Sequence, residues 1–152
     1  MHIVLATDVD WIVDEITAAL GGPDTSFTVC REGRVVVSVV AEREPDLAIL
    51  DMQIGSKGGM AVTMAMRLDE SADMLPHVPV IMLLDRRADV FLARRSGADG
   101  WLIKPLDPLR IKRAVAAVMA GGTYVEGVPV PTADVAEVAA DEAEVDAVAA
   151  NP

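Results

Sequence analysis

The chain has 152 residues, a length typical of one domain, and its single cysteine, Cys30, excludes an internal disulfide. The net charge is −11, and residues 131–152 hold six of the 24 acids but none of the 13 bases. Such a chain, with no apolar run long enough to cross a bilayer, is expected neither to attract nucleic acid nor to enter a membrane. No charged segment precedes the first apolar run, so we expect no export signal and a cytoplasmic location.

The first part of the chain alternates short apolar runs with segments of helical spacing. Residues 2–7 are expected to form a strand, and the apolar positions of residues 12–20 recur at helical spacing until Gly21-Gly22-Pro23 ends that helix. Residues 26–30 indicate a second strand. Residues 34–41 are rich in valine, which favours a strand, but the alternation of elements favours a helix, and we expect a helix.

The same alternation continues to about residue 120. Residues 47–50 are expected to form the third strand, and residues 59–68 the helix after it. The remaining expected elements are strand 78–84, helix 86–96, strand 100–103, and a helix that Asp107 caps and Gly121-Gly122 ends.

Five β–α units whose strands are apolar on both faces predict an α/β fold with a parallel sheet covered by helices on both sides. Right-handed crossovers make such a sheet doubly wound. Its working edge is formed by the carboxyl ends of the strands, and Asp8, Asp51 and Lys104 each end or follow a strand there. Two carboxylates and one amine are therefore expected to meet at one site.

The folded domain is expected to span residues 1–121. Residues 122–152 differ in composition, because Pro129 and Pro131 interrupt them and the rest is largely alanine, valine and acid. This composition predicts an acidic tail that is mostly disordered or weakly helical.

Three motifs carry a resemblance to a known family. They are Thr7-Asp8 after the first strand, Asp51 with the Gly58-Gly59 loop that follows it, and the block GADGWLIKP over residues 97–105. With the helix after that block, they make residues 1–121 resemble the receiver domain of two-component response regulators. The resemblance implies a flavodoxin-like fold, a five-stranded sheet of order 2-1-3-4-5, and a cis peptide before the proline that closes the block.

The resemblance also implies roles for individual residues. Asp51 is the implied phosphoacceptor, and Lys104 the implied partner of the phosphoryl group. Asp8, Asp51 and the backbone carbonyl of Gln53 are the implied ligands of Mg²⁺, an ion that prefers oxygen ligands and keeps several waters. A sensor kinase is the implied signalling partner.

Some positions differ from the family pattern. Leu84 stands at the first switch position, where the family has a Ser or Thr hydroxyl that hydrogen-bonds the phosphoryl group, and Asp85 follows it. Trp101 stands at the second, aromatic switch position, where Tyr or Phe is usual. Thr7 replaces the first of the two acids that usually follow the first strand. These differences leave open a receiver that works without phosphorylation.

Residues 86–113 carry eight bases and three acids within an acidic chain. The candidate partner surface on this segment consists of Arg86, Arg87, Arg94, Arg95, Arg110 and Arg113. We expect this surface to bind an acidic partner, for which the chain's own tail is one candidate, or to support a homodimer through the fourth and fifth helices.

The leading hypothesis is an atypical single-domain response regulator that acts through protein contacts and is no enzyme beyond its own phosphorylation. One alternative is a phosphorylation-independent pseudo-receiver that serves as a scaffold or binding module. Another is a flavodoxin-like or cobalamin-type cofactor-binding domain. No Ser-His-Asp, Cys-His or Walker-type pattern supports a separate enzyme activity. Too few residues follow residue 121 for a DNA-binding output domain, so no direct contact with nucleic acid is expected.

Overall fold

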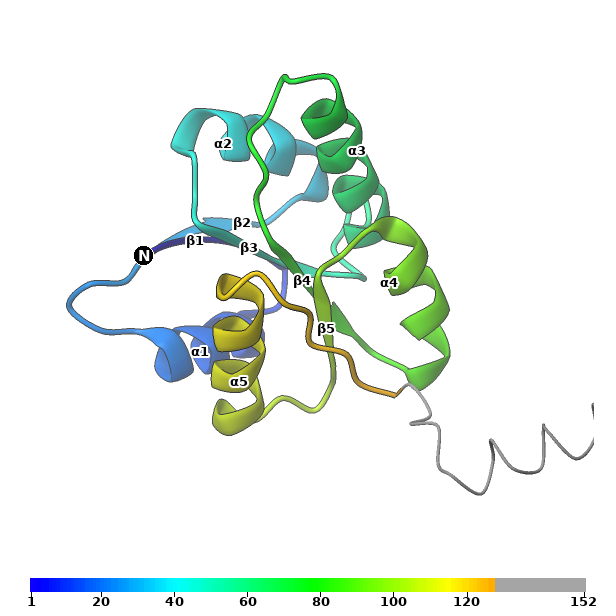
Figure 1. Cartoon of the computed structure of the whole chain (residues 1–152). Helices are drawn as coiled ribbons and strands as arrows, with labels where there is room; N and C mark the ends of the chain where they lie inside the picture. Colours follow the sequence, from blue (N-terminus) through cyan, green and yellow to red (C-terminus); the bar gives the residue numbers. More distant parts are fainter. Residues whose placement is uncertain (128–152) are drawn as a thin grey trace, which may run out of the picture.

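The computed structural model describes residues 1–127, in which strands and helices alternate (Figure 1). The strands are β1 (His2–Ala6), β2 (Ser26–Cys30), β3 (Leu47–Asp51), β4 (Val80–Leu84) and β5 (Gly100–Ile103). The helices are α1 (Asp10–Leu20), α2 (Val36–Arg43), α3 (Gly59–Ser71), α4 (Val90–Ser96) and α5 (Pro108–Met119). No helix within residues 1–127 is both long and apolar enough to cross a bilayer.

The strands form one parallel sheet in the order β2-β1-β3-β4-β5, which confirms the predicted topology. Ala6 at the end of β1 lies beside Leu50, one residue before the end of β3, and Leu84 at the end of β4 lies beside Ile103 at the end of β5. The carboxyl ends of these strands are therefore nearly level, and they form the working edge expected of a doubly wound sheet.

Helices cover both faces of the sheet. α1 and α5 lie on one face, and α2, α3 and α4 lie on the other (Figure 1). Successive side chains of a strand point to opposite faces, so Ile3 and Leu5 of β1 pack with α1 and α5, whereas Val4 and Ala6 pack with α2 and α3. This double burial explains why the strands are apolar on both faces.

The valine-rich segment forms a helix, as predicted, although its propensity alone favours a strand. A single 3₁₀ turn, Gly33–Val35, leads into α2. Val36 and Val40 lie one helical turn apart and are both fully buried in the core beneath α2. Burial of this apolar stripe stabilises the helix more than the weak intrinsic preference of valine opposes it.

Some element ends differ from the sequence prediction. The fourth helix begins at Val90 rather than residue 86, because Arg87–Asp89 forms a 3₁₀ turn. β4 begins at Val80 rather than residue 78, and the intervening Pro79 has no N–H to donate to a sheet. The third helix extends past residue 68 to Ser71.

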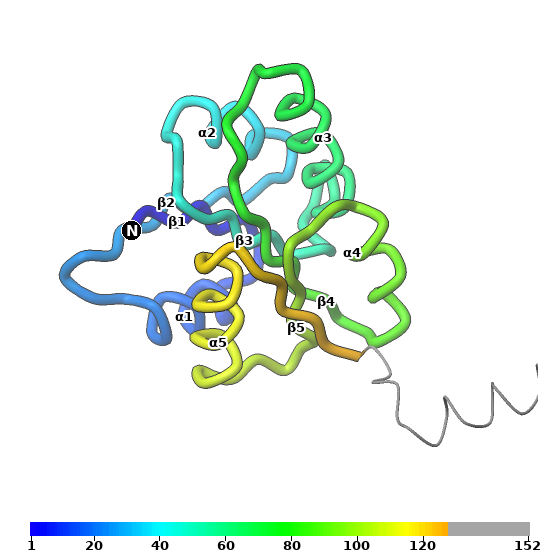
Figure 2. Tube along the Cα trace, viewed as in Figure 1, coloured from blue at the N-terminus to red at the C-terminus, as the bar shows by residue number. Residues whose placement is uncertain are grey.

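The region around α5 agrees with two expectations and extends a third. The Asp107 carboxylate accepts a hydrogen bond from the Arg110 backbone N–H at 2.9 Å, so Asp107 caps the helix as predicted. The Lys104–Pro105 peptide is cis, as implied. After α5 the chain packs against β5 over residues 123–127, past the expected boundary at residue 121 (Figure 2). The rest of the expected tail, residues 128–152, lies outside the described residues.

Candidate functional site

The candidate site lies at the carboxyl edge of the sheet, where three segments that are far apart in the sequence meet. Thr7 directly follows β1, Asp51 ends β3, and Lys104 directly follows β5. The Asp51 side chain is only 1% exposed. A carboxylate buried to this extent needs hydrogen-bonding or charged partners, because an uncompensated buried charge is costly.

Both carboxylate oxygens of Asp51 have such partners. Oδ1 accepts a hydrogen bond from Lys104 Nζ at 3.0 Å and another from the Gln53 backbone N–H at 3.1 Å. Oδ2 accepts a hydrogen bond from the Thr7 hydroxyl at 2.9 Å, and Thr7 is itself fully buried. The structure therefore brings together the strand-ending acid and the late lysine, as predicted from the sequence.

Lys104 also contacts a second carboxylate. Its Nζ lies 2.6 Å from Oδ1 of Asp85, the residue directly after β4. Burial lowers the pKa of Lys104, but the hydrogen bonds to Asp85 and Asp51 outweigh it, so the pKa lies above the ordinary 10.5. The ammonium is thus held in its charged form between one buried acid and one acid that is 43% exposed.

Asp8 is the third predicted side chain of the site, and it lies at the solvent-facing side. It is exposed, and its Oδ2 accepts a hydrogen bond from the Gly55 backbone N–H at 3.1 Å. This bond ties the start of the β1–α1 loop to the loop that follows Asp51. Within residues 1–127, Asp8 forms no hydrogen bond with Asp51 or Lys104.

The side chains and carbonyls at this edge include oxygen donors of the kind that Mg²⁺ prefers. No group of three or more His, Cys, Asp or Glu side chains in residues 1–127 is arranged to hold a metal. Mg²⁺, however, is often held by one or two carboxylates with several waters. Asp8, Asp51 and the Gln53 carbonyl are the oxygen donors that would hold such an ion, and Thr7 adds a neutral hydroxyl beside Asp51.

The family of this chain follows from residues 3–116, which match the family model of the response regulator receiver domain. The chain belongs to this receiver family. The DNA-binding response regulator MtrA of Mycobacterium tuberculosis (strain H37Rv) is 31% identical over 121 residues, which are 78% of this receiver and 49% of MtrA. The transcriptional regulatory protein CseB of Streptomyces coelicolor is 30% identical over 134 residues, with 83% and 55% covered. The receiver thus spans about half the length of these relatives.

Solved structures share the fold of this receiver. A putative response regulator from Chloroflexus aurantiacus superposes with a TM-score of 0.70 at 18% identity, covering 78% of this chain and 97% of that one. The chemotaxis response regulator CheY4 of Vibrio cholerae superposes with a TM-score of 0.67 at 19% identity, covering 77% and 97%. Membership of the receiver family speaks against the alternative of a cofactor-binding domain of the flavodoxin or cobalamin type.

The two residues expected at switch positions, Leu84 and Trp101, are both buried. Leu84 is fully buried and belongs to a small apolar cluster with Met82, Ala93 and Trp101. Trp101 is 3% exposed, and its indole N–H donates a hydrogen bond to the Glu126 carbonyl at 2.8 Å. The tryptophan ring is therefore held in the core by a residue that follows α5.

The candidate partner surface is only partly available to a partner. Arg110 forms an ion pair with Glu126, and Arg87 Nε donates a hydrogen bond to the Gly127 carbonyl at 3.1 Å. Arg86 pairs with Asp89 at 3.0 Å. The remaining predicted members, Arg94, Arg95 and Arg113, are exposed.

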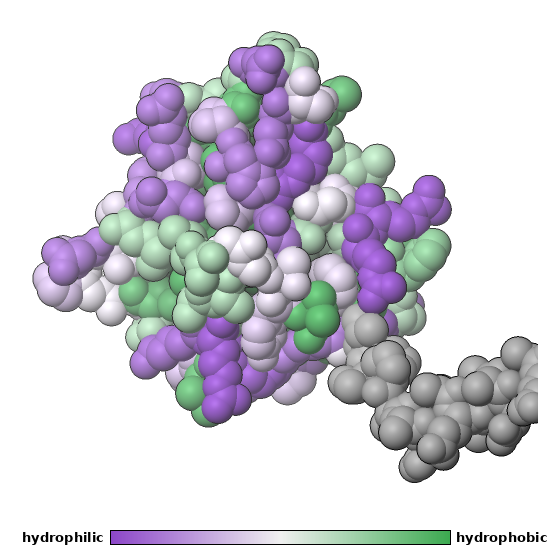
Figure 3. All heavy atoms as spheres, in the orientation of Figure 1, coloured by the Kyte–Doolittle hydropathy of each residue, from purple (hydrophilic) through white to green (hydrophobic). Residues whose placement is uncertain are grey.

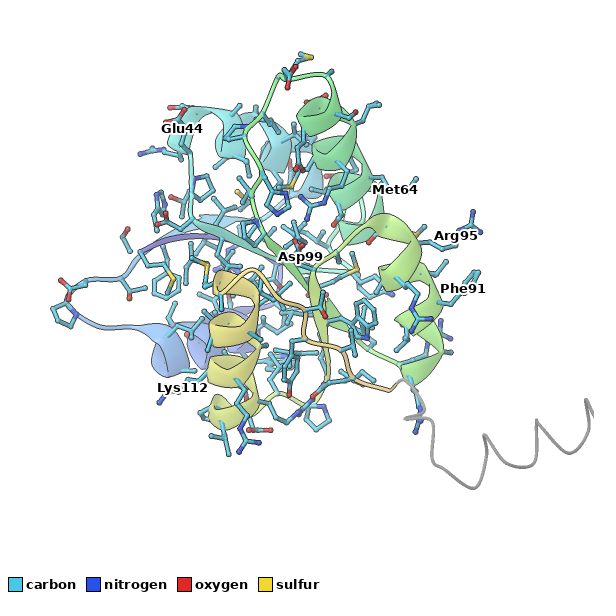
Figure 4. All side chains as sticks on the ribbon, viewed as in Figure 1. Glu44, Met64, Phe91, Arg95, Asp99 and Lys112 are labelled. Atoms are coloured by element: carbon cyan, nitrogen blue, oxygen red, sulfur yellow. The ribbon has the colours of Figure 1, made fainter. Side chains whose placement is uncertain are left out.

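Two of these three exposed arginines, Arg94 and Arg95, lie on α4. The Arg95 guanidinium lies over the ring of Phe91, 5.6 Å from its centroid, and Figure 4 shows both side chains projecting away from the sheet. In Figure 3 hydrophilic residues cover much of the outer side of α4 and part of α5, with small hydrophobic areas between them.

Sequence reasoning missed two contacts of the site. It treats Thr7 only as the loss of an acid, whereas the Thr7 hydroxyl satisfies Asp51. It notes Asp85 only as the residue that follows Leu84, whereas Asp85 pairs with Lys104. The signal for the second contact is the strand order, because Asp85 and Lys104 directly follow the paired residues Leu84 and Ile103.

Proposed function

We propose that this receiver is a signalling module in which Asp51 accepts a phosphoryl group, from a sensor kinase or a small phosphodonor, and that it acts through protein contacts. The observation that carries the proposal is the Asp51 carboxylate at the working edge of the sheet, with the Lys104 ammonium 3.0 Å from Oδ1. A carboxylate oxygen attacks phosphorus, the bond from phosphorus to the donor breaks, and the donor leaves with that electron pair.

The residues of the site each support this transfer. Lys104 has a long stem and a compact charge, so it can follow the phosphoryl oxygens as they arrive. Asp8, Asp51 and the Gln53 carbonyl are the residues that would hold Mg²⁺. When bound, the ion neutralises charge on the phosphoryl oxygens. The Asp51 oxygen that bonds to phosphorus gives up a hydrogen bond that it now accepts, either from Thr7 or from Lys104.

We expect the read-out to involve Asp85, because Leu84 has no hydrogen-bond donor. Lys104 holds Asp85 and Asp51 at the same time. If Lys104 turns towards a phosphoryl group on Asp51, the Asp85 carboxylate loses its partner and is repelled by the added charge. The loop from β4 to α4, which begins with Asp85, is then the segment that responds.

The proposal predicts one phosphoryl group on the full chain after incubation with acetyl phosphate and Mg²⁺, and none on Asp51→Asn. Intact-mass spectrometry measures the addition. Asp14→Asn, which changes an exposed acid on α1, is the matched control and should still gain the group. Equal gain in the wild type and Asp51→Asn would contradict the assignment of Asp51.

The role of Asp85 can be tested with beryllofluoride, a mimic of the phosphoryl group, in the presence of Mg²⁺. Asp85→Ala should bind it about fivefold more tightly than the wild type, because removing a partly exposed opposing charge is worth about 1 kcal/mol. Calorimetric titration measures the affinity, with Asp14→Ala as the control for a lost surface acid. Unchanged or weaker binding by Asp85→Ala would show that Asp85 does not compete for Lys104.

A second candidate function is a phosphorylation-independent binding module. It is favoured by the Thr7 hydroxyl on Asp51 and by the Asp85 carboxylate on Lys104, because both contacts satisfy the site without a phosphoryl group. A folded wild-type protein that gains no mass with any small phosphodonor would support this function in place of the first. DNA binding is part of the name of the MtrA relative, and the expectation that this chain makes no direct contact with nucleic acid stays a prediction.

A further inference from the structure

The segment that follows α5 runs along the outer edge of β5, and we call residues 123–127 the strap. The Trp101 backbone N–H donates to the Tyr124 carbonyl at 2.9 Å, and the Tyr124 N–H donates to the Asp99 carbonyl at 3.3 Å. Gly100 and Tyr124 form a parallel bridge. Figure 2 shows the strap, in orange, crossing over β5 on its way from α5 towards α4. The strap is thus an additional extended segment beside the last strand of the sheet.

One side chain anchors the strap. Oε1 of Glu126 accepts a hydrogen bond from the Ile103 backbone N–H at 2.8 Å. Oε2 accepts one from Arg110 Nε at 2.7 Å, and Arg110 Nη2 pairs with the same carboxylate. The Arg110 guanidinium is held in position by two further hydrogen bonds, which it donates to the Ile103 carbonyl at 2.8 Å and the Pro105 carbonyl at 2.8 Å. Two nitrogens of the Arg110 guanidinium therefore contact the Glu126 carboxylate, and such bidentate pairing adds geometric specificity to the ion pair.

The far end of the strap closes against α4. The Gly127 carbonyl accepts a hydrogen bond from Arg87 Nε, and a Cβ at Gly127 would lie 2.8 Å from Ile103 Cδ1 and 3.1 Å from Val90 Cγ2. The φ of Gly127 is +72°, which favours glycine. The chain therefore fits closely between β5 and α4 at this point, and the Glu126 carbonyl reaches the Trp101 indole.

The strap accepts hydrogen bonds from backbone N–H groups of β5 that would otherwise be unpaired at the edge of the sheet. In β5, the N–H groups of Trp101 and Ile103 point away from β4, and an unpaired edge of this kind is a template for another extended chain. The strap pairs the first group with a backbone carbonyl and the second with a carboxylate two residues further along. In the strap, an extended segment thus pairs with this edge and places its acid beside the Ile103 N–H and Arg110.

We propose that the outer edge of β5, with Arg110, is a binding site for an extended acidic peptide, and that the strap is its intramolecular ligand. A partner protein with an extended segment carrying an acid in the same register competes with the strap for this edge. Strap release frees the Trp101 indole and the arginines that Glu126 and Gly127 now engage. This proposal is independent of whether Asp51 is phosphorylated, because every contact that carries it lies outside the phosphoacceptor site.

The test uses the full chain with Trp11→Phe, so that Trp101 is the only tryptophan. Glu126→Ala removes the anchor, and we expect amide hydrogen exchange at Ile103 to become about tenfold faster or more, because its hydrogen bond to a charged group is lost. Exchange at Trp101 should also become faster, because the strap that carries its partner Tyr124 is released. The Trp101 emission should shift towards the red, because release of the strap exposes the buried indole to water. Glu42→Ala, at an exposed acid on α2, is the control and should change neither signal.

A second measurement tests binding in trans. A synthetic peptide with the sequence of residues 122–127 should restore slow exchange at Ile103 in the Glu126→Ala protein, whereas the peptide with alanine in place of glutamate should not. Adding Arg110→Ala to the protein should abolish the rescue. Unchanged exchange in Glu126→Ala, or equal rescue by both peptides, would overturn the proposal. A failure of phosphorylation would leave these results untouched, so the two proposals can fail separately.

Discussion

Lys104→Met should lower the free energy of unfolding by about 3 kcal/mol, because removing one partner of a buried ion pair leaves an uncompensated charge. The charge in question belongs to Asp51, whose side chain is 1% exposed and keeps only the Thr7 hydroxyl and the Gln53 N–H after the substitution. Methionine preserves most of the side-chain volume, so the loss reports the charge rather than a cavity. Urea denaturation of the wild type and the variant measures the difference.

A double-mutant cycle identifies the origin of this loss. In Lys104→Met with Asp51→Asn no charge is left at the centre of the site, so the double variant should be more stable than the sum of the two single losses indicates, by about 1–2 kcal/mol. The Asp85 carboxylate is 43% exposed and can be solvated without its partner, so it should contribute little. Additive losses in the cycle would show that Lys104 and Asp51 are not coupled energetically.

The pH dependence of stability provides an independent check on the same ion pair. The pKa of Lys104 is raised above 10.5, because the hydrogen bonds to Asp85 and Asp51 outweigh the lowering effect of burial. A group whose pKa is raised in the folded state stabilises the protein fully below its unfolded pKa and loses that effect as the pH passes its folded pKa. From neutral pH to about 10.5 the stability difference between the wild type and Lys104→Met should therefore be constant, and it should shrink as the pH rises through the folded-state pKa of Lys104.

Gly33→Ala should destabilise the protein by about 3 kcal/mol or more, since a core with no spare room must shift its backbone to admit an added atom. A Cβ at Gly33 would lie only 1.6 Å from the Lys57 carbonyl oxygen, which belongs to the loop after Asp51. The Gly33 N–H also donates to the Gly55 carbonyl at 3.0 Å, so this glycine docks that loop onto the turn before α2. Thermal and urea denaturation measure the loss.

Gly22→Ala is the matched control for Gly33→Ala. A Cβ at Gly22 has no atom within 4 Å, so we expect a change within about 1 kcal/mol, with stabilisation favoured by the lower entropy of the unfolded chain. Because Gly55 also donates its N–H to Asp8, Gly33→Ala should slow phosphate addition at Asp51 as well. Equal stabilities of the two variants would show that the loop after Asp51 yields easily.

Most of the fold could be predicted from the sequence, because it depends on local patterns. Strands apolar on both faces, helical spacing between them and glycines at the helix ends indicate the βα alternation, and right-handed crossovers restrict the topology. The least local prediction, the helix at Val36–Arg43, needed the alternation of neighbouring elements to outweigh the propensity of valine. The helix forms because its buried face completes the core.

The sequence by itself determined that Asp51 and Lys104 meet, because residues that end or follow parallel strands lie at one edge whatever their separation along the chain. Only the tertiary structure decided which other side chains join them. Whether Asp85 faces Lys104, or Thr7 faces Asp51, depends on rotamers and on the exact register between strands. The strap is a stronger case, because residues 123–127 are too short to show a periodic pattern. Their conformation is set by the open edge of β5 and the donors of Arg110, and these exist as a site only after the sheet and α5 have formed.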